Sequence, residues 1–221
     1  MIEAILFDID GTLLHTGGAG AVAWQRAFIE LYDVEANIAE HTHAGMTDPE
    51  IAAIVFREVL GRDGADTELA EAIGCYLGHL GDAVAESEGY EIMPGIEQLL
   101  PRLAGEGVLL GIVTGNIAPA ARIKLARGDL DRFFRFGGYG SDSHDRTELT
   151  RKALERGADV ADKPLDGGNA IGVGDTPRDV IACHGAKIKV VGVATGSYTV
   201  EQLTHEGADW ALEDVTQGFP A

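Results

Sequence analysis

The chain has 221 residues, a hydrophobic fraction of 45% and a formal net charge of −19 at pH 7. This length can bury a substantial core, either as one domain or as a domain with an insertion. The negative charge disfavours nucleic-acid binding, because a phosphate backbone requires a basic protein face. Since no apolar run reaches the roughly 18 residues of a membrane helix, we also expect no membrane span.

The N-terminal sequence and the cysteines indicate in which cellular compartment the protein is expected. An apolar strand is expected from the second residue onward, which leaves no room for a cleavable signal peptide. Cys75 and Cys183 are the two cysteines, far apart and without a C-x-x-C pattern. We expect buried, reduced thiols and predict a cytoplasmic protein.

Two aspartates follow the apolar run Ala4–Phe7 of the first expected strand and precede a Gly-Thr turn. In a strand, residues i and i+2 share a face, so we expect Asp8 and Asp10 to point the same way. Two carboxylates at such a short distance repel each other, and their pKa values separate unless a cation lies between them. The pair suits a nucleophile beside an acid/base group, or two oxygens for a hard metal ion. The structural alternative is an aspartate-rich turn.

Residues 16–88 have a helical pattern. Apolar positions at three- and four-residue spacing predict helices over Ala21–Tyr32, Pro49–Leu60 and Glu68–Ala85. This stretch contains 14 acidic residues, three arginines and no lysine. We expect most of these acids on a solvated outer face.

Beyond residue 90, strand-like and helix-like segments alternate. The expected elements are helix Gly95–Ala104, strand Val108–Val113, helix Ala118–Arg127, an edge-like stretch Phe133–Phe136, helix Thr147–Arg156, strand Ala170–Val173, helix Arg178–His184, strand Val190–Val193 and a last strand Ala208–Leu212. Glycines after helices mark their ends. The alternation predicts an α/β fold with a doubly wound parallel sheet, whose ligands bind at the carboxyl ends of the strands.

Polar motifs occur at those strand ends. Thr114–Asn116 follows the strand at 108–113, and Gly174–Asp179 follows the strand at 170–173. Arg146 precedes the helix expected at 147–156, and Arg151, Lys152 and Lys163 follow this arginine along the chain.

Taken in order, Asp8–Thr12, Thr114–Asn116, Arg146 and Gly174–Asp179 resemble the four motifs of the haloacid dehalogenase (HAD) superfamily. Most members are phosphohydrolases that form an aspartyl-phosphate. The third motif of this superfamily is a lone cation, usually a lysine ahead of a helix. In this chain Arg146 is the best match, and its rivals are Arg151, Lys152 and Lys163. Residues 16–88 resemble the helical cap of the phosphoglycolate-phosphatase-like and β-phosphoglucomutase-like branch. The resemblance implies a HAD-type Rossmann-like core at residues 1–15 and 89–221, with a small α-helical cap domain at residues 16–88.

The resemblance also implies a role for each motif residue. Asp8 would be the nucleophile and Asp10 the acid/base group. The carboxylates of Asp8 and Asp175 and the carbonyl oxygen of Asp10 would hold Mg²⁺, and Asp179 would orient Asp175 or a metal-bound water. The phosphate would be bound by Thr114, Gly115, Asn116 and Arg146.

The function implied is Mg²⁺-dependent hydrolysis of a small phosphorylated metabolite by a monomer or homodimer. The alternatives are phosphoglucomutase-type phosphoryl transfer, haloacid dehalogenation and a non-catalytic HAD-fold binding module. Asp10 speaks against the dehalogenase, whose family lacks a second aspartate. The sequence does not name the substrate, but we expect specificity in residues 11–20 and 41–48, with His43 as the first histidine to test.

Overall fold

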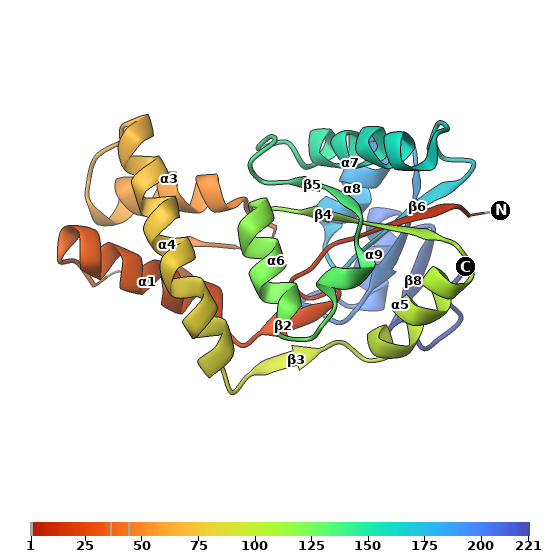
Figure 1. Cartoon of the computed structure of the whole chain (residues 1–221), viewed down its shortest axis with the longest axis horizontal. Helices are drawn as coiled ribbons and strands as arrows, with labels where there is room; N and C mark the ends of the chain where they lie inside the picture. The colour runs from red at the N-terminus through yellow and green to blue at the C-terminus, as the bar shows by residue number, and fades with distance from the viewer. Residues whose placement is uncertain (1, 36, 44) are drawn as a thin grey trace.

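The computed structural model describes residues 2–35, 37–43 and 45–221. Figure 1 shows a sheet with helices on both of its faces at one end of the molecule, and a separate group of helices at the other end. Both chain termini lie at the sheet end.

The main sheet has six strands in the order β5-β4-β1-β6-β7-β8, and every neighbouring pair is parallel. Its strands are β1 (Ala4–Phe7), β4 (Leu109–Thr114), β5 (Phe136–Tyr139), β6 (Ala170–Gly174), β7 (Lys189–Val193) and β8 (Trp210–Leu212). The predicted doubly wound parallel sheet is confirmed. Because β1 lies between β4 and β6, the ends of these three strands share one edge of the sheet.

Alternating residues of β1 pack on opposite faces of the sheet. Ile5 and Phe7 belong to the core beneath α5 (Ile96–Gly105) and α6 (Ala118–Ala126). Ala4 and Leu6 belong to the core beneath α7 (Arg146–Ala161), α8 (Pro177–Gly185) and α9 (Val200–Glu206). Asp8 follows the same alternation as Ala4 and Leu6. Its side chain therefore lies at the carboxyl edge of the sheet, on the face covered by α7 and α8.

A helical segment, defined here as residues 19–86, leaves and re-enters the sheet region through a two-stranded antiparallel ribbon of β2 (Leu14–Thr16) and β3 (Tyr90–Ile92). It contains α1 (Ala19–Tyr32), α2 (Ile38–His41), α3 (Asp48–Val59) and α4 (Asp66–Glu86). Its own core includes Trp24, Phe28, Phe56, Tyr76 and Leu80. Among the described helices, none combines the length and apolarity needed to cross a membrane.

The three helices predicted for this segment are present, whereas α2 and the ribbon were not predicted. Its boundaries as a separate domain stay a prediction. Met1, Ala36 and Ala44 fall inside the predicted domain ranges, and Ala44 inside the predicted specificity stretch, but all three lie outside the described residues.

Two glycine-containing stretches differ from the prediction. The edge strand lies at Phe136–Tyr139 instead of 133–136, because residues 131–133 form a 3₁₀ turn. The glycines of that strand allow α7 to pack closely: a Cβ on Gly138 would lie 1.9 Å from the Leu149 carbonyl oxygen. Helix α7 continues past Gly157, where a Cβ would lie 2.6 Å from the Phe136 ring. Close packing, not a helix end, therefore accounts for Gly157. Helix α9 was also not predicted.

Candidate active site

A cavity of about 190 Å³ lies between the helical segment and the carboxyl ends of β1 and β4. The sequence-predicted residues that line it are Asp8, Asp10, Thr114, Gly115, Asn116 and Arg146. The structure therefore brings the first, second and third motifs to one place. Asp175 and Asp179, of the fourth motif, lie directly behind Asp8.

Arg146 is the first residue of α7, and its side chain turns inward toward two carboxylates. Its Nη2 atom lies 2.9 Å from Asp8 Oδ1 and 2.6 Å from Asp179 Oδ1. All three side chains are nearly inaccessible to solvent. The rival cations are elsewhere: Arg151, Lys152 and Lys163 pair with the exposed or part-exposed Glu148, Glu155 and Glu3, respectively. Of the four candidates for the third motif, the structure brings Arg146 to the site.

Asp175 follows β6, and its carboxylate is closely surrounded by Thr12, Gly11 and Gly196. It accepts a hydrogen bond of 2.9 Å from the Thr12 hydroxyl. A Cβ on Gly11 would lie 2.5 Å from Asp175 Oδ2, and one on Gly196 would lie 1.8 Å from the same atom. Gly11 also has a φ of +88°, which L side chains rarely adopt. The Gly11 of the first motif is therefore required both by backbone conformation and by space for Asp175.

Asp179 lies at the start of α8 and has two structural partners. One carboxylate oxygen faces Arg146, and the other accepts hydrogen bonds from the backbone N–H (3.0 Å) and hydroxyl (2.7 Å) of Thr176. Thr176 is the N-cap of α8, with Asp179 completing a capping box. This helix start fixes Asp179 beside Asp8 and Asp175.

Asp8, Asp175 and Asp179 fit a hard divalent cation. One oxygen from each carboxylate lies within 4.8 Å of the others, and all three residues are buried. Burial, with the neighbouring Asp179 carboxylate, raises the pKa of both Asp8 and Asp175, although Arg146 opposes this shift. One guanidinium thus faces three carboxylates, which leaves an excess of negative charge. An all-oxygen ligand set of this kind suits Mg²⁺.

Asp10 has different partners from Asp8, because β1 ends at Phe7 and Asp10 lies beyond it. The Nζ atom of Lys124, on α6, lies 2.9 Å and 2.8 Å from the two carboxylate oxygens of Asp10. Asn116 Nδ2 donates a further bond of 2.7 Å. The side chain of Asp10 is 43% exposed, facing the cavity. Desolvation by its surroundings opposes the charge, but Lys124 and Asn116 outweigh it and lower the pKa of this aspartate.

Lys124 is a site residue that the sequence analysis did not assign. It is only 6% exposed and lies on the face of α6 that buries Ala120 and Ala121. A lysine three and four residues after buried alanines shares their helix face. That position was the one available signal that this lysine points inward.

The loop after β4 connects the site to the helical segment. Thr114 Oγ1 accepts from the Asn116 amide nitrogen (3.2 Å) and side chain (2.7 Å), so its own O–H can donate toward the cavity. The Gly115 carbonyl accepts from the backbone N–H of Asp48 at 2.9 Å, and the Ile117 N–H donates to the Asp48 carboxylate at 2.8 Å. Burial raises the pKa of Asp48 to about 6. Asp48 is the last residue of the stretch 41–48 in which we expected specificity, but no role of its own was predicted for it.

The wall opposite the sheet is largely aromatic and apolar. Trp24 and Tyr76 stack with ring centroids 4.2 Å apart and planes within 7°. Both line the cavity, as does His43, the histidine singled out by the sequence analysis. The buried Trp24 Nε1 has no hydrogen-bond partner among the described residues.

A model of the haloacid dehalogenase-like hydrolase family matches residues 5–193. The chain belongs to this family. It is 29% identical over 233 residues to a phosphoglycolate phosphatase of Rhodospirillum rubrum, covering 100% of this chain and 92% of the relative. A pyrophosphatase-like protein of Clostridium perfringens is 24% identical over 217 residues, covering 96% and 94%. The chain is thus a HAD-type hydrolase, in agreement with the resemblance found in the sequence.

The fold agrees with solved structures of the family. CbbY of Rhodobacter sphaeroides, whose structure was solved in complex with phosphate, superimposes with a TM-score of 0.76 at 23% identity. The match covers 99% of this chain and 96% of that one. The helical segment is therefore part of the shared architecture.

Proposed function

We propose that this hydrolase is a Mg²⁺-dependent phosphatase that cleaves a small-molecule phosphomonoester through a phosphoryl group carried by Asp8. The observation that carries the proposal is the cluster of Asp8, Asp175, Asp179 and Arg146 at the end of the cavity. It combines a nucleophile, an oxygen-rich cation site and a cation for phosphate. Relatives named as phosphatases support the same reaction class.

Asp8 is suited to attack phosphorus because it lies at the end of β1 and lines the cavity. Mg²⁺ would be held by the carboxylates of Asp8 and Asp175, the Asp10 carbonyl oxygen and, directly or through water, Asp179. When bound, it would neutralise charge on the phosphoryl group and on Asp8. Arg146, the Thr114 hydroxyl and the Gly115 N–H would bind the equatorial oxygens, where transition-state charge collects. The Asn116 N–H already donates to Thr114 Oγ1 and would help to orient that hydroxyl.

Asp10 would give a proton to the leaving oxygen and later take one from the attacking water. Because Lys124 and Asn116 lower its pKa, the carboxylate form is favoured, which suits the second of these two transfers. Its carboxylate is oriented by Lys124 and Asn116, so these two residues mark the side of the cavity on which the leaving group would lie. Lys124 offers that group a positive charge. The helical segment would act as a cap that excludes water from the reaction.

The cavity favours a small substrate. Its volume of about 190 Å³ accommodates a phosphoryl group with a short leaving group. Because Lys124 faces the leaving-group side, a small ester with a second negative group fits the site. Phosphoglycolate, in the name of the R. rubrum relative, is the first compound to test.

The test is phosphate release from a set of small phosphorylated metabolites, each assayed with Mg²⁺ and with EDTA, using Asp8→Asn as the matched inactive protein. We expect release that depends on both Mg²⁺ and Asp8, with phosphoglycolate among the better substrates. Full activity in EDTA, or halide release from a 2-haloacid, would contradict the proposal.

A further inference from the structure

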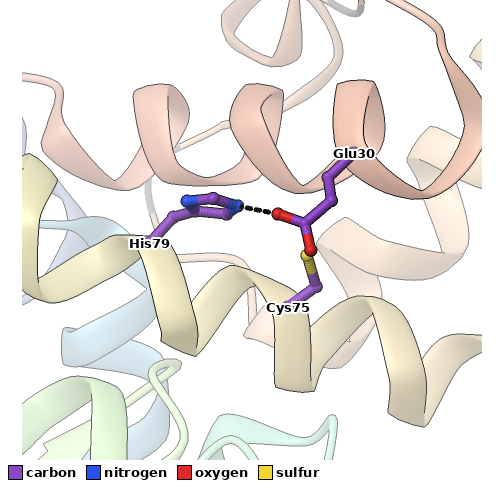
Figure 2. A group of neighbouring side chains, drawn as sticks. All are labelled: Glu30, Cys75 and His79. Atoms are coloured by element: carbon purple, nitrogen blue, oxygen red, sulfur yellow. Dashed lines mark hydrogen bonds and ion pairs between the residues drawn. The ribbon is translucent and has the colours of Figure 1, made fainter.

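A second cluster of metal-ligating side chains lies in the helical segment, between α1 and α4. Cys75 and His79 are four residues apart on α4, so they share one face of that helix. Glu30 lies near the C-terminal end of α1, which packs on this face. Figure 2 shows the three side chains converging between the helices, with the Glu30 carboxylate between the imidazole and the sulfur.

The three side chains are close enough to share one ion. One ligand atom of each lies within 4.8 Å of the other two. His79 Nε2 and Glu30 Oε2 are already 2.8 Å apart. Zn²⁺ bonds to carboxylate, imidazole and thiolate at about 2.0–2.3 Å, so tetrahedral ligand atoms stand roughly 3.3–3.8 Å from one another. Small side-chain rotations would therefore bring this group to bonding distance, with the fourth position open to water.

The chemistry of the cluster differs from that of the active site. Asp8, Asp175 and Asp179 offer only oxygen, which favours Mg²⁺. A sulfur, an imidazole nitrogen and a carboxylate oxygen favour Zn²⁺ or another thiophilic divalent ion. The surroundings are also suited to a cation, since residues 16–88 contain 14 acids against three arginines.

We propose that Glu30, Cys75 and His79 form a binding site for Zn²⁺ that is independent of the catalytic site. Without metal, burial and the Glu30 carboxylate raise the pKa of the Cys75 thiol, so the sulfur carries its proton. Binding forms a Zn–S bond and releases this proton to solvent, with no change of oxidation state. Affinity for Zn²⁺ therefore increases with pH.

An ion at this site would tie together the two helices that carry the aromatic wall of the cavity. Tyr76 follows Cys75 on α4, and its ring stacks on Trp24 of α1. A link between Glu30 on α1 and the Cys75–His79 pair on α4 restricts how far these helices can separate. We expect Zn²⁺ to stabilise the helical segment against heat.

The decisive experiment is a Co²⁺ titration of the full chain after treatment with EDTA, followed by absorption spectroscopy. A thiolate ligand gives Co²⁺ a sulfur-to-metal charge-transfer band, which the all-oxygen active site cannot produce. Because the active site also takes a divalent ion, we expect this band to saturate within two equivalents of Co²⁺, and we expect Zn²⁺ to abolish it. Cys75→Ser should remove the band, whereas the matched Cys183→Ser should retain it. Absence of the band in the wild type, or its persistence in Cys75→Ser, would overturn the proposal.

Two further measurements keep the outcome clear if Cys75→Ser folds poorly, as judged by circular dichroism. His79→Gln removes a different ligand and should weaken Co²⁺ binding about tenfold or more. Zn²⁺ should raise the Tm of the EDTA-treated wild type, and this increase should be smaller in Glu30→Gln. Unchanged Co²⁺ affinity in His79→Gln, with an equal Tm increase in Glu30→Gln, would show that the ion binds elsewhere.

Discussion

The two walls of the cavity are built on different principles. The sheet wall consists of strand ends and helix starts whose charged side chains, Asp8, Asp10, Lys124 and Arg146, are all paired with one another or with neighbours. The helical wall is largely aromatic and apolar; its polar lining residues are Thr42, His43 and Asp48, and the described residues lining it include neither lysine nor arginine. This difference leads us to expect that the sheet side supplies the charge for the proposed reaction, while the helical side sets the shape of the cavity. Substitutions on the sheet wall should therefore change kcat, and those on the helical wall should change KM.

The strongest test of the sheet wall is Asp8→Asn. The amide cannot attack phosphorus, so we expect kcat on p-nitrophenyl phosphate to fall about 10³-fold or more. Because the change removes one of three crowded carboxylates, the Tm without Mg²⁺ should be unchanged or higher. Retention of a tenth of the activity would mean that water attacks directly.

Arg146→Met should lower kcat by about 10²–10³-fold, the typical cost of losing a donor to transition-state charge. Arg146→Lys should restore most of this activity, because a single Nη2 atom makes both ion pairs in the structure. Arg151→Met, on the surface, is the matched control. If it reduced kcat as much as Arg146→Met does, Arg146 would not be the phosphate-binding cation.

Lys124→Met removes the counter-charge of Asp10 but leaves Asn116 in place. We expect kcat to fall about 10–10²-fold, since acid/base groups typically contribute 10²–10⁴-fold and Lys124 acts through one. Phosphoglycolate should suffer more than a phosphomonoester with an uncharged leaving group. Lys152→Met, an exposed lysine of α7, is the control. Equal losses on both substrates would leave Lys124 with a role in orienting Asp10 alone.

Stability should depend on pH and Mg²⁺ together. Asp8 and Asp175 have raised pKa values in the folded protein, so the folded state holds more protons than the unfolded state above the ordinary aspartate pKa of about 4. The free energy of unfolding should therefore fall as pH rises from 5 to 8. Glu68, with a pKa of about 2, is already ionised throughout this range.

Thermal unfolding at pH 5 and pH 8, with and without Mg²⁺, measures this dependence. Mg²⁺ should raise the Tm more at pH 8, because protons compete less for the carboxylates. Asp175→Asn should flatten the pH dependence. A Mg²⁺ effect of equal size at both pH values would argue against binding at these aspartates.

The smallest expected effect belongs to the helical wall. Trp24→Phe keeps an aromatic ring beside Tyr76 and removes the buried indole N–H. If that N–H donates to the substrate, KM should rise about threefold to tenfold with kcat unchanged, as for one hydrogen bond. Trp210→Phe, in β8, is the matched control. A change in kcat without a change in KM would contradict the expectation that the helical wall affects binding and the sheet wall affects turnover.

The sequence predicted those parts of the site that follow directly from strand ends. Asp8, Thr114 and Asp175 follow apolar runs, and parallel strands end at a common edge of the sheet, so the sequence alone predicted that they meet. Arg146 was preferred among four cations because it stands at a recognisable helix start. The three rivals stayed open because the sequence does not show in which direction the first side chain of that helix points.

The remainder depends on contacts between elements distant in sequence. Helical periodicity places Lys124 on a face of α6, but the partner of that face, Asp10, is 114 residues away. Asp48 likewise depends on the docking of α3 on the loop after β4. Gly157 and Gly138 show a further limit: glycine marks both helix ends and close packing, and the sequence does not separate the two.

The docking of the two walls also bears on how such an enzyme changes its substrate. The contacts between Asp48 and the 115–117 loop involve main-chain groups on the sheet side, and a Cβ on Gly115 would lie 2.2 Å from the Met46 carbonyl oxygen. Main-chain atoms are the same in every residue, so changes of side chain at positions 116 and 117 leave these contacts intact. Ile117 and Ala120 of the sheet side also pack in one buried cluster with Trp24 and Tyr76. Side chains in that cluster are therefore less free to vary than the rest of the helical wall, and we expect a change of preferred metabolite to begin at cavity residues outside it.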